Sequence, residues 1–239
     1  CRDGRAGGYV VERHTNGTVY VGEFVNDVDE GQGVYRFVSG EVLEGEFRNY
    51  VLDGYGRRRC PDGEIYEGEF RSGKYHGKGI LHYDDGDVYE GEFEDGGRHG
   101  FGEYRRTNGD VYVGEFRDDS YCGKGRYTYK DGTVHEGDYR DGELNGHGIQ
   151  RFPNGDVYEG EFRDCMMYGL GTIRYGDGDV YKGEFWNDKI QGRGTMYYAD
   201  GDVYEGEFHP NHTTYGWIRT STGTYRCTRY TDGRIHWEE

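Results

Sequence analysis

Residues 154–162 read Asn-Gly-Asp-Val-Tyr-Glu-Gly-Glu-Phe, and nearly the same sequence recurs along the chain. The Gly-Glu-Phe triplet begins at Gly22 and returns every 23 residues up to Gly206, with Gly-Asp-Tyr in its place at Gly137. These nine copies are separated by no insertion or deletion. A fixed period of about 20–50 residues is the signature of a stacked repeat protein, in which each unit packs mainly on its neighbours. The sequence therefore predicts a repeat array rather than globular domains.

Each unit contains two strand-like segments. The first is Tyr-x-Gly-x-Phe, as in residues 66–70, and alternation along a strand puts its Tyr, Gly and Phe on one face. The second follows a Gly-x-Gly pair, and the same alternation adds Leu81 and Tyr83 to that face. An Asn-Gly or Asp-Gly dipeptide, whose residues both tolerate positive φ, joins one segment to the next and is a strong hairpin signal.

We therefore expect an all-β protein with one β-hairpin per repeat, stacked into an elongated, twisted single-sheet meander. Two strands at about 4.8 Å each add roughly 10 Å per repeat. Neighbouring strands in a sheet rotate by about 20–25°, which is the reason for the expected twist.

The repeat pattern divides the chain into three parts. Residues 1–7 carry no pattern and are predicted to be frayed or disordered. Residues 8–208 form the array, a partial repeat followed by about nine in-phase units. Residues 209–239 are a degenerate terminal repeat, because Tyr215 and Trp217 stand where the period requires glycines. We expect this part to act as a cap or a dimerisation segment, since terminal repeats close a stack. The first residue is Cys1 and the array starts in mid-unit, so we expect a piece of a longer protein.

Composition narrows the classes of partner. The formal net charge of -17 weighs against nucleic acid and against simple attachment to anionic lipid, since both need clustered Lys and Arg. The hydrophobic fraction is low, 33%, but it includes 25 Tyr and 11 Phe, and these large rings supply the buried area that aliphatic residues usually supply. Five Cys without framework spacing favour reduced thiols and a cytoplasmic protein. No apolar run reaches the roughly 20 residues of a membrane span.

Charged residues also recur at the 23-residue period. An acidic column runs from Glu23 to Glu207, and a mostly basic column runs from Arg36 to Arg174. Both fall on the face opposite the aromatic one. Because oppositely charged cross-strand pairs contribute roughly 0.2–1 kcal/mol each, we interpret the columns as structural ladders on the solvated face.

The recurring Tyr-x-Gly-x-Phe, Gly-x-Gly and Asp-Gly turn resemble the MORN (membrane occupation and recognition nexus) repeat family over residues 8–208. The chain departs from the pattern at Leu43 and His135, which replace the first Tyr, and at Asp138-Tyr139, which replace Glu-Phe. The resemblance implies an elongated β-hairpin sheet with an aromatic groove. It also implies scaffolding in cytoskeletal, ciliary or membrane-associated assemblies, capture of a partner helix or peptide, and self-association through terminal repeats. Phosphoinositide binding has been proposed for the family.

The candidate partner-binding residues are the aromatic residues of the expected groove, since aromatic rings make efficient interface anchors. We expect most of them to form the packed core and those left exposed in the groove to contact an apolar helix or extended segment of a partner. They are Tyr66, Phe70, Tyr89, Phe93, Tyr112, Phe116, Tyr158, Phe162, Tyr181 and Phe185.

The best candidate for a metal site is the irregular tail, where His209, His212, Cys227 and His236 supply zinc-type ligands. Their spacing matches no standard zinc module. The alternative interpretation is that they are ordinary surface histidines, and the one cofactor we consider is a zinc ion at an oligomer interface.

We find no nucleophile motif, cofactor fingerprint or catalytic carboxylate pair, and expect no enzyme. The favoured function is a non-enzymatic scaffold and protein-interaction module, cytoskeleton- or cilium-associated and homodimeric through its C-terminal repeats. The alternative is a phosphoinositide-binding membrane module.

Overall fold

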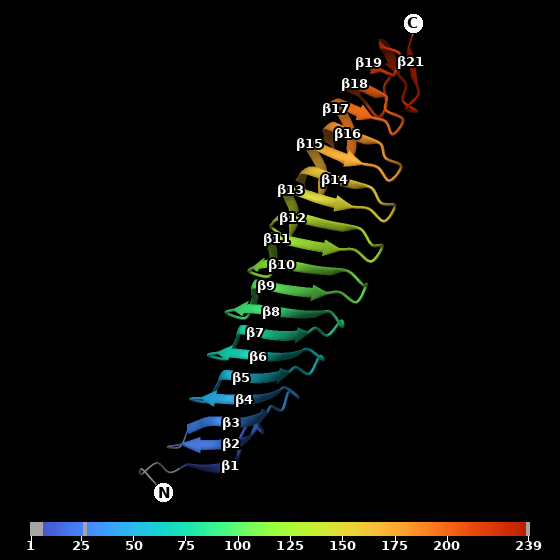
Figure 1. The fold of residues 1–239 in the computed structure, drawn as a ribbon. Coiled ribbons are helices and arrows are strands. Elements are labelled where there is room, and N and C mark those ends of the chain that lie inside the picture. Colours follow the sequence, from blue (N-terminus) through green and yellow to red (C-terminus); the bar gives the residue numbers. More distant parts are fainter. Residues whose placement is uncertain (1–6, 26–27, 238–239) are drawn as a thin grey trace. The chain divides into compact units, whose positions relative to one another are not determined.

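A computed structural model describes residues 7–25 and 28–237. The chain divides into two compact units, Cys1–Ser120 and Tyr121–Glu239, which we describe separately. The expectation of fraying at residues 1–7 lies outside the described residues except for Gly7, which begins the first strand. The described residues contain no helix and hence none long and apolar enough to cross a membrane (Figure 1).

Strands of seven or nine residues make up the first unit. They are β1 (Gly7–Arg13), β2 (Val19–Val25), β3 (Val28–Arg36), β4 (Val42–Arg48), β5 (Val51–Arg59), β6 (Ile65–Arg71), β7 (Lys74–His82), β8 (Val88–Glu94), β9 (Gly97–Arg105) and β10 (Val111–Arg117).

The strands of the second unit follow the same plan and shorten toward the C-terminus. They are β11 (Ser120–Thr128), β12 (Val134–Arg140), β13 (Glu143–Arg151), β14 (Val157–Arg163), β15 (Met166–Arg174), β16 (Val180–Trp186), β17 (Lys189–Tyr197), β18 (Val203–Phe208), β19 (Thr214–Arg219), β20 (Thr224–Arg229) and β21 (Ile235–Trp237). In the described part of the tail, residues 209–237, three short strands follow the last regular repeat.

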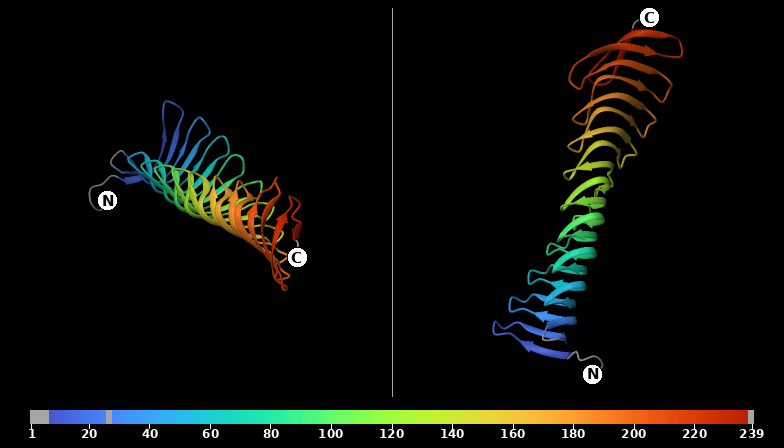
Figure 2. Two further views of the ribbon diagram at one scale, coloured as in Figure 1. Left: turned by 90° about the horizontal axis from the view of Figure 1, so that it is seen from above. Right: turned by 90° about the vertical axis from the view of Figure 1, so that its left-hand side faces the viewer.

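Within each unit every strand pairs antiparallel with the next one in sequence, as the ribbons of Figures 1 and 2 show. In the first unit β6 pairs with β7 so that Gly68 lies opposite Gly79. In the second unit β14 pairs with β15 so that Gly160 lies opposite Gly171. The prediction of an all-β meander of stacked hairpins is therefore confirmed.

The Asp-Gly dipeptides form three-residue hairpin loops. At Asp85-Gly86 the Gly86 N–H donates to the Tyr83 carbonyl over 3.1 Å, and the Tyr83 N–H donates to the Asp87 carbonyl over 2.9 Å. Only Gly86 has positive φ, at 91°. This is a type I turn followed by a glycine bulge. Of the two residues of the dipeptide, which both tolerate positive φ, only the glycine adopts it.

A second kind of turn joins the two strands of each repeat, and sequence reasoning missed it. At Ser72-Gly73 both residues are left-handed, with φ of 49° and 77°. That is the pattern of a two-residue type I′ loop. The Gly73 N–H donates to the carbonyl of Leu52, one repeat earlier, over 2.9 Å. These turns therefore bind successive repeats to each other.

The acidic column has a different role from the one predicted. The strand register shifts between Gly68 and Glu69, and Gly77 in the facing bulge has a φ of 55°. The Glu69 carboxylate lies over Gly77, where a Cβ would come within 2.5 Å of its Cδ, and it accepts the Lys78 N–H over 3.1 Å. Glutamate thus takes the space that glycine leaves open.

The basic column does not face the acidic one. Arg105 lies opposite Val88 and Val111, whereas Glu92 of the acidic column lies opposite Lys78. The predicted charge ladders between the two columns are therefore wrong. The strand register sets the columns about four residues apart along each strand, beyond the reach of a direct cross-strand pair.

Candidate partner-binding groove

The two faces of the sheet differ in kind. The aromatic face carries the Tyr and Phe of each Tyr-x-Gly-x-Phe segment. The acidic face, opposite, carries Glu69, Lys78, Glu92 and their equivalents, because side chains alternate along a strand.

On the aromatic face each repeat tyrosine lies flat over a pair of facing glycines. Tyr66 covers Gly68 and Gly79, where a Cβ on Gly79 would come within 2.6 Å of the ring atoms Cε2 and Cζ. The Tyr66 hydroxyl donates to the carbonyl oxygen of Glu69 over 2.8 Å. Burial raises the pKa of this hydroxyl. The glycines are therefore required by the ring that packs on them.

The rings form a ladder from one repeat to the next. Tyr66 packs edge to face on Phe70 of its own repeat and on Phe93 of the next, each with ring centroids 5.0 Å apart. The second unit repeats the pattern, with Tyr158 and Phe185 at 4.8 Å. Edge-to-face contacts of this kind contribute about 0.5–1.5 kcal/mol each beyond the buried area.

The structure places all ten predicted groove residues in this packed core, each 0–4% exposed. They are Tyr66, Phe70, Tyr89, Phe93, Tyr112, Phe116, Tyr158, Phe162, Tyr181 and Phe185. A partner could contact these rings only if the hairpins opened. We therefore assign them to the core, the first of the two roles expected for the groove aromatics, and look for partner contacts elsewhere.

Two repeats that lack the tyrosine fill its place differently. Where Leu43 replaces the tyrosine, Leu52 packs over the glycine pair, and where His135 replaces it, Leu144 does so. Leu52 and Leu144 are 2% and 0% exposed, and each Cδ lies 3.0 Å from the Cβ position of the covered glycine, Gly56 or Gly137. The signal was present in the sequence, since each leucine stands nine residues after the substituted position.

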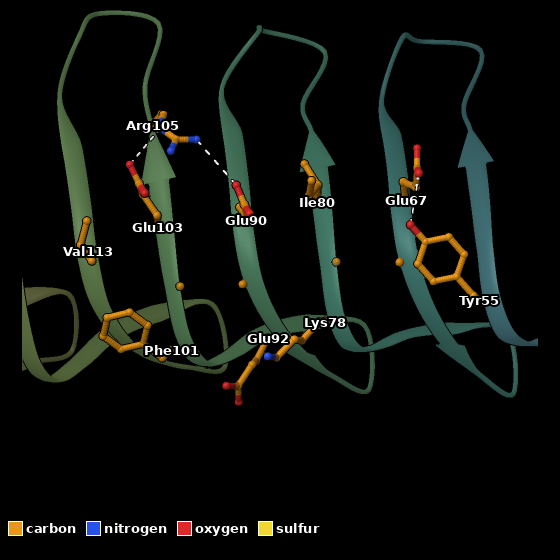
Figure 3. A pocket seen from close by; sticks show the side chains of 14 residues that line it. Tyr55, Glu67, Lys78, Ile80, Glu90, Glu92, Phe101, Glu103, Arg105 and Val113 are labelled. Atoms are coloured by element: carbon orange, nitrogen blue, oxygen red, sulfur yellow. Dashed lines mark hydrogen bonds and ion pairs between the residues drawn. The ribbon is translucent and has the colours of Figure 1, made fainter.

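The acidic face of the first unit contains a shallow groove of about 640 Å³ that crosses β5 to β10 (Figure 3). Backbone of the paired glycines forms its floor. Its walls alternate apolar and charged side chains. The lining residues are Tyr55, Glu67, Gly68, Lys78, Gly79, Ile80, Glu90, Gly91, Glu92, Phe101, Gly102, Glu103, Arg105 and Val113.

Tyr55 and Phe101 are the two aromatic anchors of this groove, and each is 58% exposed. Both occupy the middle position of a Gly-x-Gly pair, which places their rings on the face opposite the one that these glycines share with the repeat tyrosines. Strands are about 4.8 Å apart, which puts the rings, on β5 and β9, roughly 19 Å apart. Sequence reasoning missed both residues because it looked only at the regular aromatic positions.

Charges in the groove are predominantly negative. Four glutamates face one lysine and one arginine, and Arg105 is already engaged, 2.8 Å from Glu103 and 3.9 Å from Glu90. The Tyr55 hydroxyl donates to Glu67 over 3.1 Å, and desolvation together with this hydrogen bond raises the pKa of Tyr55. The groove can therefore receive a chain with cationic and apolar groups.

The predicted metal ligands of the tail are only partly brought together. His209 and His212 have ring centroids 4.3 Å apart, whereas Cys227 is buried in β20 and His236 lies on β21. Burial raises the pKa of the Cys227 thiol, which disfavours the thiolate that zinc needs. Within residues 7–25 and 28–237, no group of three His, Cys, Asp or Glu residues is placed to hold a metal. A zinc ion shared between two copies stays a prediction.

Comparison with known families identifies the repeat. A family model of the MORN repeat matches residues 20–42, 44–65, 66–88, 89–111, 112–134, 135–157, 158–180 and 181–203. The chain belongs to the MORN-repeat family. The resemblance stated from the sequence is confirmed, and each matched MORN repeat from Tyr66 onward begins at the first residue of the Tyr-x-Gly-x-Phe segment or its His135 substitute.

Other comparisons add little to the MORN assignment. No curated protein matches the chain in sequence. Among solved structures, the TCP10 domain of CPAP from Danio rerio is similar at 14% identity and a TM-score of 0.41, over 96% of this chain and 99% of that chain. The TCP domain of SAS-4 from Drosophila melanogaster, in complex with a proline-rich motif of Ana2, is similar at 14% identity and a TM-score of 0.38, over 77% and 89%. At these TM-scores neither likeness carries an argument about this MORN protein.

Proposed function

We propose that this MORN array is a non-enzymatic scaffold that binds an extended segment of a partner protein along the groove of the acidic face. The observation that carries the proposal is the pair of exposed anchors, Tyr55 and Phe101, at the two ends of a glycine-floored groove. A gap of roughly 19 Å between them is spanned by about six extended residues. Aromatic anchors of this kind dominate binding energies at protein interfaces.

The partner segment carries basic and apolar residues. Its basic side chains meet Glu67, Glu90 and Glu92, and its apolar side chains meet the rings and Ile80. Charge complementarity accelerates association and falls with ionic strength. Binding through this groove is therefore expected to weaken as salt is added.

Selection from a random peptide library displayed on phage tests the proposal for a partner of any sequence. We expect enriched peptides to combine Lys or Arg with aliphatic or aromatic residues. Their affinity should fall at least tenfold on the Tyr55→Ala/Phe101→Ala double variant. A Tyr9→Ala variant is the matched control, because Tyr9 is an exposed aromatic on β1 outside the groove. Peptides that bind the double variant with unchanged affinity would refute the groove assignment.

Self-association through residues 209–239 is part of the same proposal. Tyr215 and Trp217 are 66% and 56% exposed, which is unusual for rings of this size and favours an interface between copies. Light scattering coupled to size-exclusion chromatography should give a dimer mass, and a monomer mass for Tyr215→Ser/Trp217→Ser. Repeating the run in chelator tests the zinc ion at His209 and His212, since an unchanged mass removes it.

The place of the scaffold in the cell follows from the family resemblance. We propose a cytoplasmic protein associated with the cytoskeleton or a cilium. A fluorescent fusion that stays diffuse in the cytoplasm would contradict this location. Phosphoinositide binding is the alternative function, and lack of cosedimentation with phosphoinositide vesicles at low salt would remove it.

A further inference from the structure

A second cavity, unrelated to the groove, lies in the second unit on the aromatic face. It has a volume of about 300 Å³ and lies where residues 229–231 approach β15, β16 and β17. Its apolar lining consists of Met167, Ile173, Phe185, Ile190 and Phe208.

The charged lining of this cavity is positive, against the trend of a chain with a net charge of -17. Lys189 and Arg229 face a single carboxylate, Asp188, and His209 adds a neutral imidazole. The Oδ1 atom of Asp188 already accepts the Met167 N–H over 2.8 Å. His209 accepts the Asn211 N–H at Nδ1 over 3.1 Å, which leaves its Nε2 as a donor. The polar groups around the cavity are thus mainly donors.

Arg229 is the central donor. Its guanidinium carbon lies 4.8 Å from the centroid of the Phe208 ring, and the guanidinium also hydrogen-bonds the hydroxyl of Tyr198, which is a neutral partner. The Nε of Arg229 is buried and has no hydrogen-bond acceptor among the residues that the structure describes. Leaving a buried charged donor unpaired costs free energy, so an acceptor from outside the chain is favoured here.

The first unit shows what a satisfied site of this kind looks like. Arg98 also packs on the aromatic ladder, with its guanidinium carbon 5.4 Å from the Phe116 ring centroid. There Asp119 supplies both acceptors, since the Arg98 Nε donates to Oδ1 over 3.1 Å and its Nη2 donates to the Asp119 carbonyl over 2.7 Å. No carboxylate of the described residues makes an ion pair with Arg229. In the second unit Asp188 occupies the repeat position of Asp119, three repeats later, and Met167 occupies that of Arg98. Arg229 thus lines the same cavity as Asp188 without forming an ion pair with it.

We propose that this cavity binds a small oxyanion attached to an apolar body, a carboxylate or phosphate on an aryl or alkyl group. A guanidinium presents two parallel donors that match such oxygens. Lys189 and the Nε2 of His209 supply further donors, and Phe208, Ile190 and Met167 receive the apolar body.

Isothermal titration with four probes tests the proposal: benzoate, phenyl phosphate, benzyl alcohol and inorganic phosphate. We expect benzoate or phenyl phosphate to bind saturably, and their comparison tells carboxylate from phosphate. Benzyl alcohol and inorganic phosphate should bind at least tenfold more weakly, because each lacks one half of the ligand. If benzyl alcohol bound as tightly as benzoate and phenyl phosphate, the proposal would be overturned, since the cavity would then select only for apolar groups. Equal binding of inorganic phosphate, or no binding of any probe, would overturn it as well.

Variants assign the binding to this cavity. Arg229→Gln should weaken the better probe at least tenfold, and Lys189→Gln should weaken it several-fold. Arg219→Gln is the matched control, because Arg219 lies on β19 outside the cavity. Circular dichroism shows whether Arg229→Gln lowers the β content. If it does, Lys189→Gln still tests the proposal, because Lys189 is exposed and its replacement should leave the fold intact. Unchanged affinity in both variants would overturn the proposal.

Discussion

Replacing Gly79 by alanine tests the central packing argument, that each tyrosine ring requires the glycines beneath it. The new Cβ would come within 2.6 Å of Cε2 and Cζ of Tyr66. Carbon atoms in good contact are about 3.5–4.0 Å apart, so the ring must move by roughly 1 Å. It has little room, because its centroid is 3.8 Å from that of Tyr75 and 5.0 Å from those of Phe70 and Phe93.

The expected cost follows from this geometry. Overpacking a well-packed core costs about 1–3 kcal/mol, and a ring held on three sides belongs at the upper end of that range. The matched control is Gly8→Ala, also in a strand, where a Cβ would meet nothing within 4 Å. Glycine to alanine without strain stabilises by about 0.4–1 kcal/mol through the unfolded state. The two substitutions should therefore have opposite signs.

Urea unfolding followed by circular dichroism measures the difference. With a slope of about 1–3 kcal/mol per molar urea, Gly79→Ala should lower the midpoint by about 1 M. Because repeat arrays can unfold in parts, hydrogen exchange of the β6–β9 amides should show the loss concentrated there. The cost should shrink in a Tyr66→Ala background, since the clash is gone. Two results would refute the reasoning. One is a change in unfolding free energy for Gly79→Ala equal to that for Gly8→Ala, and the other is a Gly79→Ala cost that is the same in the Tyr66→Ala background as in the native chain.

Three further predictions follow from single contacts. Tyr158→Phe removes the 2.9 Å hydrogen bond to the Glu161 carbonyl and should cost about 1 kcal/mol in urea unfolding, whereas an unchanged midpoint would show the bond to be unimportant. Ser72→Gly relieves a left-handed φ of 49° and should raise the thermal midpoint by the equivalent of roughly 0.5 kcal/mol, and a lower midpoint would contradict this. Burial lowers the pKa of His135 below its ordinary 6.5, so the unfolded state binds more protons and stability should fall as pH drops below 6.5. A His135→Gln variant should lose that part of the pH dependence, measured as thermal midpoints at pH 7.5 and 5.5, and an unaltered dependence would assign it to other groups.

The sequence by itself determined the architecture. The 23-residue period, the alternation of Tyr, Gly and Phe and the Asp-Gly turns are all local signals, and local signals suffice when every unit packs only on its neighbours. The face on which the aromatic residues lie also followed, because alternation along a strand is geometric. The type I′ turn escaped notice because its left-handed positions are filled by Ser, Asp, Asn, Tyr or Cys as readily as by Gly.

Only the tertiary structure decided which side chains are free to bind. The sequence did not tell which of the regular tyrosines and phenylalanines are core residues and which contact a partner. Stacking of successive hairpins buries all ten candidates to 0–4% exposure, and this burial depends on neighbours one repeat away. Tyr55 and Phe101 stay exposed because they point to the opposite face, between glycines. The cavity at Arg229 likewise arises from the approach of the irregular tail to β15–β17, residues about 40–60 positions earlier in the chain. A periodic sequence specifies contacts between equivalent positions, and such non-equivalent contacts exist only once the chain has folded.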